Sequence, residues 1–262
     1  MKFRFQRKYF SIPYVVFLSL FVLVPICLIV FYAFTDSTGR LSFDAAGKFF
    51  SDVSNLNVIL VSLFLAVQTT LICLIIGYPI AYLLANKKYN KNAVLVMLFI
   101  MPMWINFVLR TTATRDILFA IGINGGNFPY LATSIGMVYN YLPFVILPLY
   151  TTMLKLDKSQ IEAAADLGAN PVQVFIHSIF PQSIPGVISA VTMTLVPVMS
   201  SYVISDALSE GNITLIGNFI YLNFANNQWN NGSFMAFILL ILVVFSMFMT
   251  RSDSEESRGN LW

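Results

Sequence analysis

Residues 58–85 read VILVSLFLAVQTTLICLIIGYPIAYLLA, a run of 28 residues without Asp, Glu, Lys or Arg. A helix of about 20 apolar residues crosses the roughly 30 Å hydrocarbon core of a bilayer. One charge at the centre of such a helix costs about 2.5–3.5 kcal/mol, so insertion requires an uncharged run of this kind. The segment therefore predicts a transmembrane helix.

The composition of the whole chain agrees with this prediction. Of its 262 residues, 58% are hydrophobic and only 10% are charged, against about 25% charged residues in an ordinary soluble domain. So few charges cannot cover a water-exposed surface, which excludes soluble, disordered and nucleic-acid-binding classes. Cys27 and Cys73 both lie in apolar runs, and His177 is the only histidine. The sequence predicts neither a disulfide framework nor a metal site.

Five further apolar segments resemble the first. The six predicted spans are about 12–34, 58–85, 93–109, 131–154, 184–205 and 234–250. Several contain proline or polar residues, which favour kinked helices around a polar interior. The prediction is an all-α membrane helix bundle, one transmembrane domain over residues 1–262.

The distribution of basic residues predicts the orientation of the bundle. With the N-terminus inside, eleven of the 15 Lys and Arg residues lie in cytoplasmic segments, as the positive-inside rule requires. Arg110 is one of the four assigned to outside segments. Both termini are expected in the cytoplasm, and the polar, acidic tail 251–262 is expected to be disordered.

The segment 155–183 is unusually long for a connection between two spans. It contains LDKSQIEAAADLGANP at residues 156–171. Asp157 or Ser159 could cap a short helix, Gly168 suits its end, and Pro171 suits the start of the next helix. The alanines at 163–165 leave one surface with almost no side chain. The pattern predicts a cytoplasmic helix that docks into a groove of another protein.

This pattern resembles the EAA loop, EAA-x3-G-x9-I-x-LP, of the membrane subunits of bacterial ABC importers. Glu162, Ala163, Ala164, Gly168 and Pro181 stand at the matching positions, whereas Ser178 and Phe180 replace the usual Ile and Leu. The resemblance implies a type I (MetI-like) permease fold. It also implies that Glu162, Ala163, Ala164, Asp166 and Gly168 couple the bundle to a separate ATPase.

The chain has no G-x-x-x-x-G-K-[ST] loop and no recognisable catalytic constellation. We therefore expect no enzymatic activity and no cofactor in this chain, with ATP and Mg bound by the partner ATPase. The lipid bilayer is an expected partner, and nucleic acid is not.

Other stretches are similar to spermidine/putrescine permeases of the PotB type. They are the N-terminal span, the LRTTATRD stretch at 109–116, and residues 205–234 with IGN at 216–218. The family reads RTYAW where this chain has RTTAT. The resemblance implies transport of polyamines, with a PotA-like ATPase dimer, a PotC-like second permease and a PotD-like extracytoplasmic binding protein as partners. The membrane is then the bacterial plasma membrane.

A polyamine needs carboxylates to balance its charge and aromatic faces to replace its hydration. Asp206 and Tyr202 are candidates for the substrate path, with Trp104 and with Glu210 one turn later if the helix continues. Tyrosine and tryptophan are also common at any membrane interface.

Two alternatives stay open. A related permease could carry sulfate, ferric iron or a phosphonate, although the predicted spans offer no Lys or Arg for an anion. A stand-alone secondary transporter would leave the EAA pattern unexplained, and such carriers usually show ionisable residues at the midplane and internal repeats.

Overall fold

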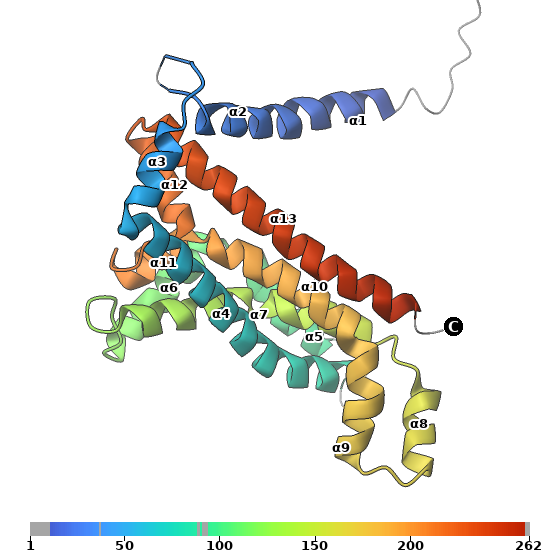
Figure 1. Ribbon diagram of the computed structural model, residues 1–262. Helices are drawn as coiled ribbons and strands as arrows, with labels where there is room; N and C mark the ends of the chain where they lie inside the picture. Colours follow the sequence, from blue (N-terminus) through green and yellow to red (C-terminus); the bar gives the residue numbers. More distant parts are fainter. Residues whose placement is uncertain (1–10, 37, 88–89, 91–93, 260–262) are drawn as a thin grey trace, which may run out of the picture. The chain divides into compact units, whose positions relative to one another are not determined.

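The computed structural model describes residues 11–36, 38–87, 90 and 94–259 (Figure 1). Within these ranges every regular element is a helix, and Thr35 and Leu41 form an isolated β-bridge. The elements are α1 (Ser11–Leu18), η2 (Ser19–Leu23), α2 (Val24–Ala33), α3 (Asp44–Ser51), α4 (Val53–Ala85), α5 (Val94–Ile100), η3 (Met101–Trp104), α6 (Phe107–Ala120), α7 (Pro129–Met153), α8 (Lys158–Asp166), α9 (Pro171–Val174), η4 (Phe175–Ile179), α10 (Phe180–Met199), α11 (Tyr202–Ser209), α12 (Ile216–Ala225) and α13 (Trp229–Gly259). The all-α prediction is confirmed.

Five helical segments of the described chain are long and apolar enough to cross a membrane. They are Pro13–Ala33, Val53–Ala85, Pro129–Met153, Pro171–Met199 and Trp229–Phe248. A bent pair, Val94–Trp104 with Phe107–Ala120, makes a sixth if it counts as one span. Each predicted span therefore has a helical counterpart, although several bounds differ.

The third predicted span, 93–109, is wrong as a straight helix. The chain breaks after Trp104, and α6 leaves at 96° to the preceding helix. The side chain of Asn106 caps α6 by accepting hydrogen bonds from the backbone N–H groups of Val108 and Leu109, at 2.9 and 3.4 Å. Since this cap satisfies the first free N–H groups of α6, a new helix begins inside the apolar run.

The helix that corresponds to the predicted fifth span, 184–205, has other bounds, and it begins within the predicted loop 155–183. A continuous helix of α9, η4 and α10 begins at Pro171 and ends at Met199. It begins early because Asn170 and Gln173 form a capping box, and α11 starts separately after a break at Ser200 and Ser201. The described part of the polar tail is also helical, since α13 continues to Gly259.

Contacts divide the chain into two compact units. The first comprises residues 1–57 and 219–241, described from residue 11 onward except for residue 37. Aromatic rings form its core: the ring centroids of Phe34 and Phe237 lie 5.1 Å apart, and those of Phe49 and Phe234 lie 5.5 Å apart. The Asn230 amide also donates to the Tyr32 carbonyl oxygen at 3.0 Å. Edge-to-face aromatic packing thus joins residues from both ends of the sequence.

The second unit comprises residues 58–218 and 242–262, of which 58–87, 90, 94–218 and 242–259 are described. Its centre is α7, which packs against α5, α6, α10 and α11. Glycines allow two of its contacts to be close. A Cβ atom on Gly77 of α4 would lie 2.9 Å from Val145 Cγ1, and one on Gly186 of α10 would lie 2.8 Å from Thr152 Oγ1. Both helices are therefore held tightly against α7.

We expect Gly186→Val to destabilise the second unit by about 1–3 kcal/mol, because the added atoms overlap Thr152 and overpacked interiors relax only by moving backbone. Thermal unfolding of the purified protein in mild detergent measures the change. Gly47→Ala is the control, since no atom lies within 4 Å of the position of its Cβ. Equal unfolding temperatures for the two variants would contradict this account of the α7–α10 contact.

Candidate functional site

The residues of the EAA pattern form α8, a separate helix that begins with a strong cap. The Asp157 carboxylate accepts hydrogen bonds from Ser159 N at 2.9 Å and Ser159 Oγ at 2.6 Å. These bonds hold the pKa of Asp157 below its usual value, and the bond from the Ser159 hydroxyl has the larger effect. The carboxylate is therefore charged at neutral pH, next to the free N–H groups of the first helical turn. Capping by Asp157 is confirmed.

The end of α8 also follows the sequence prediction. Gly168 has φ = +83°, and its N–H donates to the Ala165 carbonyl oxygen at 2.9 Å. Glycine reaches this left-handed conformation without the steric cost that a Cβ atom would add. Pro171 is then the first residue of α9, directly after the N-cap residue Asn170. Two capped helices joined by a short turn result, and they lie together at one end of the second unit (Figure 1).

The exposed side of α8 carries the residues implied in coupling. No residue of α8 is buried; Ile161 and Ala164 are half-buried, whereas Glu162, Ala163 and Asp166 are exposed. Ile161 and Ala164 are spaced three apart, so they share the face that packs on α9 and η4. The opposite face is small and acidic, which suits the close approach of another protein.

Apolar side chains near the turn were missed by the sequence reasoning. Leu167 is 88% exposed and Val172 is 64% exposed. Single exposed apolar residues are common, but Leu167 begins the four-residue connection between the two capped helices and Val172 lies in the first turn after it. They extend the exposed small-residue face with apolar surface. The sequence alone does not separate them from core residues, since nothing in it reports exposure.

A cavity of about 410 Å³ lies between α8 and the end of α4. Tyr82, Lys87, Lys158, Ile161 and Glu162 are among the residues that line it. Two lysines and one glutamate thus share this space at the base of α8.

The substrate-path candidates divide between two regions of the second unit. Tyr202 and Asp206 stand one turn apart on α11, and both are exposed. Glu210 follows the helix with φ = +53° and forms its left-handed end, so the helix does not continue through Glu210, the condition on which its placement one turn after Asp206 depended. Trp104 ends η3 and is 86% exposed. The structure thus pairs Tyr202 with Asp206, and it places Trp104 on a different element.

Arg110 is a charged residue whose burial the sequence did not indicate. It lies in the first turn of α6 and is only 7% exposed. Its Nε and Nη1 atoms have no hydrogen-bond partner among the described residues, and the same is true of the buried hydroxyl of Ser201. A buried charge normally needs a partner. Its position at the end of an apolar run gave no sign of burial.

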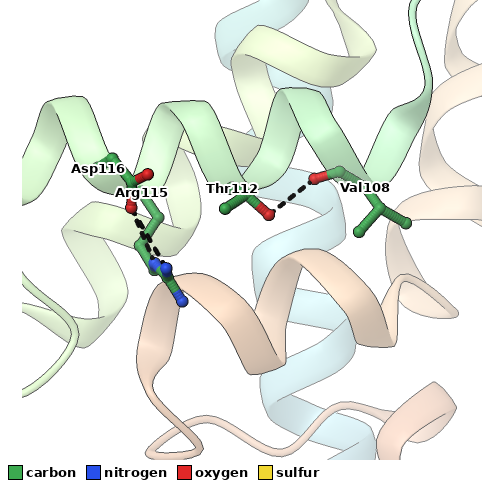
Figure 2. A network of polar contacts seen from close by, with 4 residues as sticks. All are labelled: Val108, Thr112, Arg115 and Asp116. Carbon is green, nitrogen blue, oxygen red and sulfur yellow. Dashed lines mark hydrogen bonds and ion pairs between the residues drawn. The ribbon is translucent and has the colours of Figure 1, made fainter.

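One side of α6 carries polar groups, although the helix also exposes Val108, Leu109, Ile117 and Phe119. Figure 2 shows Arg115 and Asp116 paired at 3.2 Å, with the Thr112 hydroxyl donating to the Val108 carbonyl oxygen at 3.0 Å. Both charged side chains are about half or more exposed, and such ion pairs contribute little to stability.

No family model matches the sequence. The spermidine/putrescine transport system permease protein PotB of Escherichia coli (strain K12) is 35% identical over 201 residues, which cover 71% of this chain and 73% of that protein. PotB of Haemophilus influenzae is 31% identical over 252 residues, 88% of both proteins. The chain belongs to the PotB family. A PotB homologue of Mycoplasma genitalium is 25% identical over 94% of the chain.

Solved structures of ABC transporters share the fold. The importer of the acidic polysaccharide alginate matches 94% of this PotB-family chain with a TM-score of 0.67 and 16% identity. The MetNI methionine transporter in inward-facing conformations matches 77% of it with a TM-score of 0.58 and 18% identity. The resemblance to MetI-like ABC permeases is therefore confirmed for the fold. The chain is a transport subunit of a membrane complex, and its relatives are permeases that are not themselves enzymes.

Proposed function

We propose that this chain is a permease subunit of an ATP-driven importer that carries polyamines such as spermidine or putrescine inward. The observation that carries the proposal is the similarity to PotB proteins. PotB of Haemophilus influenzae is 31% identical to this chain over an alignment that covers 88% of both proteins. The exposed, capped helix α8 supports it, because a stand-alone transporter has no need of such a helix.

In this proposal α8 is the contact with a separate ATPase, which binds ATP and Mg. Ala163 lets the ATPase approach the backbone, Ala164 keeps the adjoining half-buried face small, Glu162 and Asp166 supply an acidic edge, and Gly168 lets the chain turn back. Closure of the ATPase dimer moves α8, and the bundle then opens alternately to the two sides of the membrane. The other partners are a second permease and an extracytoplasmic binding protein, of PotC and PotD type.

The orientation belongs to the same proposal. An importer's ATPase is cytoplasmic, so α8 lies on the cytoplasmic side, and both chain termini do as well. The basic residues support this, since Lys87, Lys155 and Lys158 lie at the α8 end of the second unit. The Arg115–Asp116 pair and α11 then lie toward the outside. The membrane is the bacterial plasma membrane.

We assign the polyamine path to Asp206 and Tyr202, with Trp104 and Glu210 as further members. The Asp206 carboxylate balances one amine, and the Tyr202 ring one turn earlier offers its face to the alkyl chain and the cation. Because both residues are exposed on α11, a substrate reaches them without unfolding the helix.

Arg110 favours a second candidate cargo. A buried guanidinium with two nitrogen atoms unpaired among the described residues suits an anion such as sulfate or a phosphonate better than a polyamine. The same importer mechanism would then carry an anionic solute. Uptake measured with both kinds of substrate separates the two candidates.

Purification of the tagged chain from its own membranes in mild detergent is expected to recover a P-loop ATPase and a second, different permease. Proteoliposomes containing these subunits and the binding protein should then accumulate labelled spermidine or putrescine when ATP is present. Mass spectrometry and uptake measure the two results. Recovery of the chain alone from several detergents would contradict the importer, and uptake of sulfate but not of polyamine would contradict the cargo.

Glu162→Lys should reduce uptake at least about tenfold while the bundle still inserts and assembles, because the acidic edge of α8 becomes basic where the ATPase docks. Uptake in proteoliposomes and copurification of the ATPase measure the effect. Lys48→Glu serves as the control. Lys48 is exposed on α3, far from α8 in the sequence, and this substitution also reverses a charge. Normal uptake by Glu162→Lys would rule out docking through this edge.

Asp206→Asn should raise the polyamine concentration needed for half-maximal uptake about fivefold or more, since one carboxylate that balances an amine is lost. Asp116→Asn on α6 makes the same charge change at an exposed ion pair and should leave that concentration within about twofold of the wild-type value. Equal behaviour of the two variants would remove Asp206 from the path.

A further inference from the structure

The side chain of Gln182 joins the coupling helix to the membrane span that follows it. Its Oε1 accepts a hydrogen bond from the backbone N–H of Asp157, the cap of α8, at 2.9 Å. Its Nε2 donates to the Ser178 carbonyl oxygen at 3.0 Å. One amide therefore uses both its acceptor and its donor. It ties the start of α8 to α10, 25 residues away in the sequence, and to a carbonyl group of η4.

The next residue joins the same span to α4. The hydroxyls of Ser183 and Tyr78 lie 2.7 Å apart in a hydrogen bond, and Ser183 is completely buried. The Ser183 hydroxyl also lies 2.8 Å from the Phe180 carbonyl oxygen. The Tyr78 ring packs against Phe175 and Phe180, with centroids 5.6 and 6.2 Å away. Tyr78 is thus held by one hydrogen bond and two aromatic contacts, all from η4 and the start of α10.

The regular backbone hydrogen bonding of both helices is interrupted where this contact forms. Pro79 follows Tyr78 and has no N–H, so the Ile75 carbonyl oxygen loses its usual partner inside α4. Opposite it, η4 is a π-helical turn in which Phe180 N donates to Phe175 O, five residues back. Single π turns recur at functional sites because they interrupt the regular helix. The two interruptions face each other across the Tyr78–Ser183 hydrogen bond.

Beyond this level both helices are fixed. Gly77 holds α4 close to Val145, and Gly186 holds α10 close to Thr152, so both rest on α7. A displacement of α8 therefore reaches α10 at Gln182, before its fixed point, and is passed to η4 through the Ser178 carbonyl group. Because Tyr78 lies at the same level as the interrupted turn, a bend of that turn is passed to α4 at Pro79.

We propose that Gln182 and Tyr78 form a relay that transmits the displacement of α8 to α4. The relay runs from Asp157 through Gln182 to η4, and from Ser183 through Tyr78 to α4. It rests on the proposed importer function, and it identifies residues that position the moving parts without touching ATP or substrate. Loss of either side chain leaves the ATPase able to hydrolyse ATP and lowers the amount of substrate moved by each hydrolysis.

The test uses the complete importer, with ATPase, second permease and binding protein, in proteoliposomes. Tyr78→Phe keeps the ring contacts and removes the hydroxyl, Ser183→Ala removes the same hydrogen bond from the other side, and Gln182→Met keeps the length of the side chain and removes the amide. The ratio of labelled spermidine taken up to phosphate released is measured for each. We expect this ratio to fall at least about threefold in each variant, while ATP hydrolysis without binding protein stays within about twofold of wild type.

The double variant Tyr78→Phe/Gln182→Met distinguishes a relay from two separate contacts. If the two side chains act in series, the double variant is no worse than the more affected single variant. Tyr150→Phe, which removes the hydroxyl of a half-buried tyrosine of α7 outside the relay, should leave the ratio at the wild-type value.

Unchanged ratios in Tyr78→Phe, Ser183→Ala and Gln182→Met would overturn the relay while leaving the importer function intact. Effects that multiply in the double variant would overturn it as well. A wild-type complex that hydrolyses ATP without taking up spermidine would overturn the proposed cargo, and the relay as tested here would fall with it.

Discussion

The second unit depends on one constraint: a backbone N–H or C=O group that leaves a helix in apolar surroundings must find a partner within the protein. Residues 200–218 contain two helix breaks, and side chains supply the partners. Ser62 of α4 accepts from Ile216 N at 2.9 Å, Ser209 accepts from Ile213 N at 3.0 Å, and Ser205 donates to Ile213 O at 2.7 Å. All three serines are completely buried. One side of the irregular segment that carries α11 is therefore anchored in the interior, while Tyr202 and Asp206 stand on its exposed side.

This constraint explains why the two ends of the second unit differ. At the α8 end, the caps are local: Asp157 caps its own helix, and Asn170 and Gln173 cap the next. Helices that satisfy their own ends can project and still fold. At the α11 end, the hydrogen bond between Ser62 and Ile216 joins residues 154 positions apart, so the backbone there is satisfied by a distant helix and not by its own cap. At both ends the backbone groups at helix termini find hydrogen-bond partners: α8 finds them in its own caps, and the α11 segment finds them in buried serines.

The sequence predicted the features that depend on local chemistry. The uncharged run 58–85 identified a span, Asp157 and Gly168 identified the ends of α8, and the EAA pattern identified the family. Features that depend on tertiary contacts were not predictable. Asn106 starts a helix at a right angle inside an apolar run, and Arg110 is buried although it follows that run directly. Both residues are polar and near a predicted boundary, where hydropathy cannot distinguish a solvent-exposed side chain from one enclosed by neighbouring helices.

The contrast between the ends also bears on how motion passes through the bundle. Van der Waals contact at Gly77 and Gly186 leaves α4 and α10 no freedom to slide on α7, because close-packed interiors shift in discrete steps. The helices can yield only where their own hydrogen bonding is already interrupted, at Pro79 and in η4. A hydrogen bond across that level, between Tyr78 and Ser183, makes the two helices bend together. A displacement applied at α8 is therefore confined to the few side chains that bridge the interruptions, and it does not spread evenly through the packed helices.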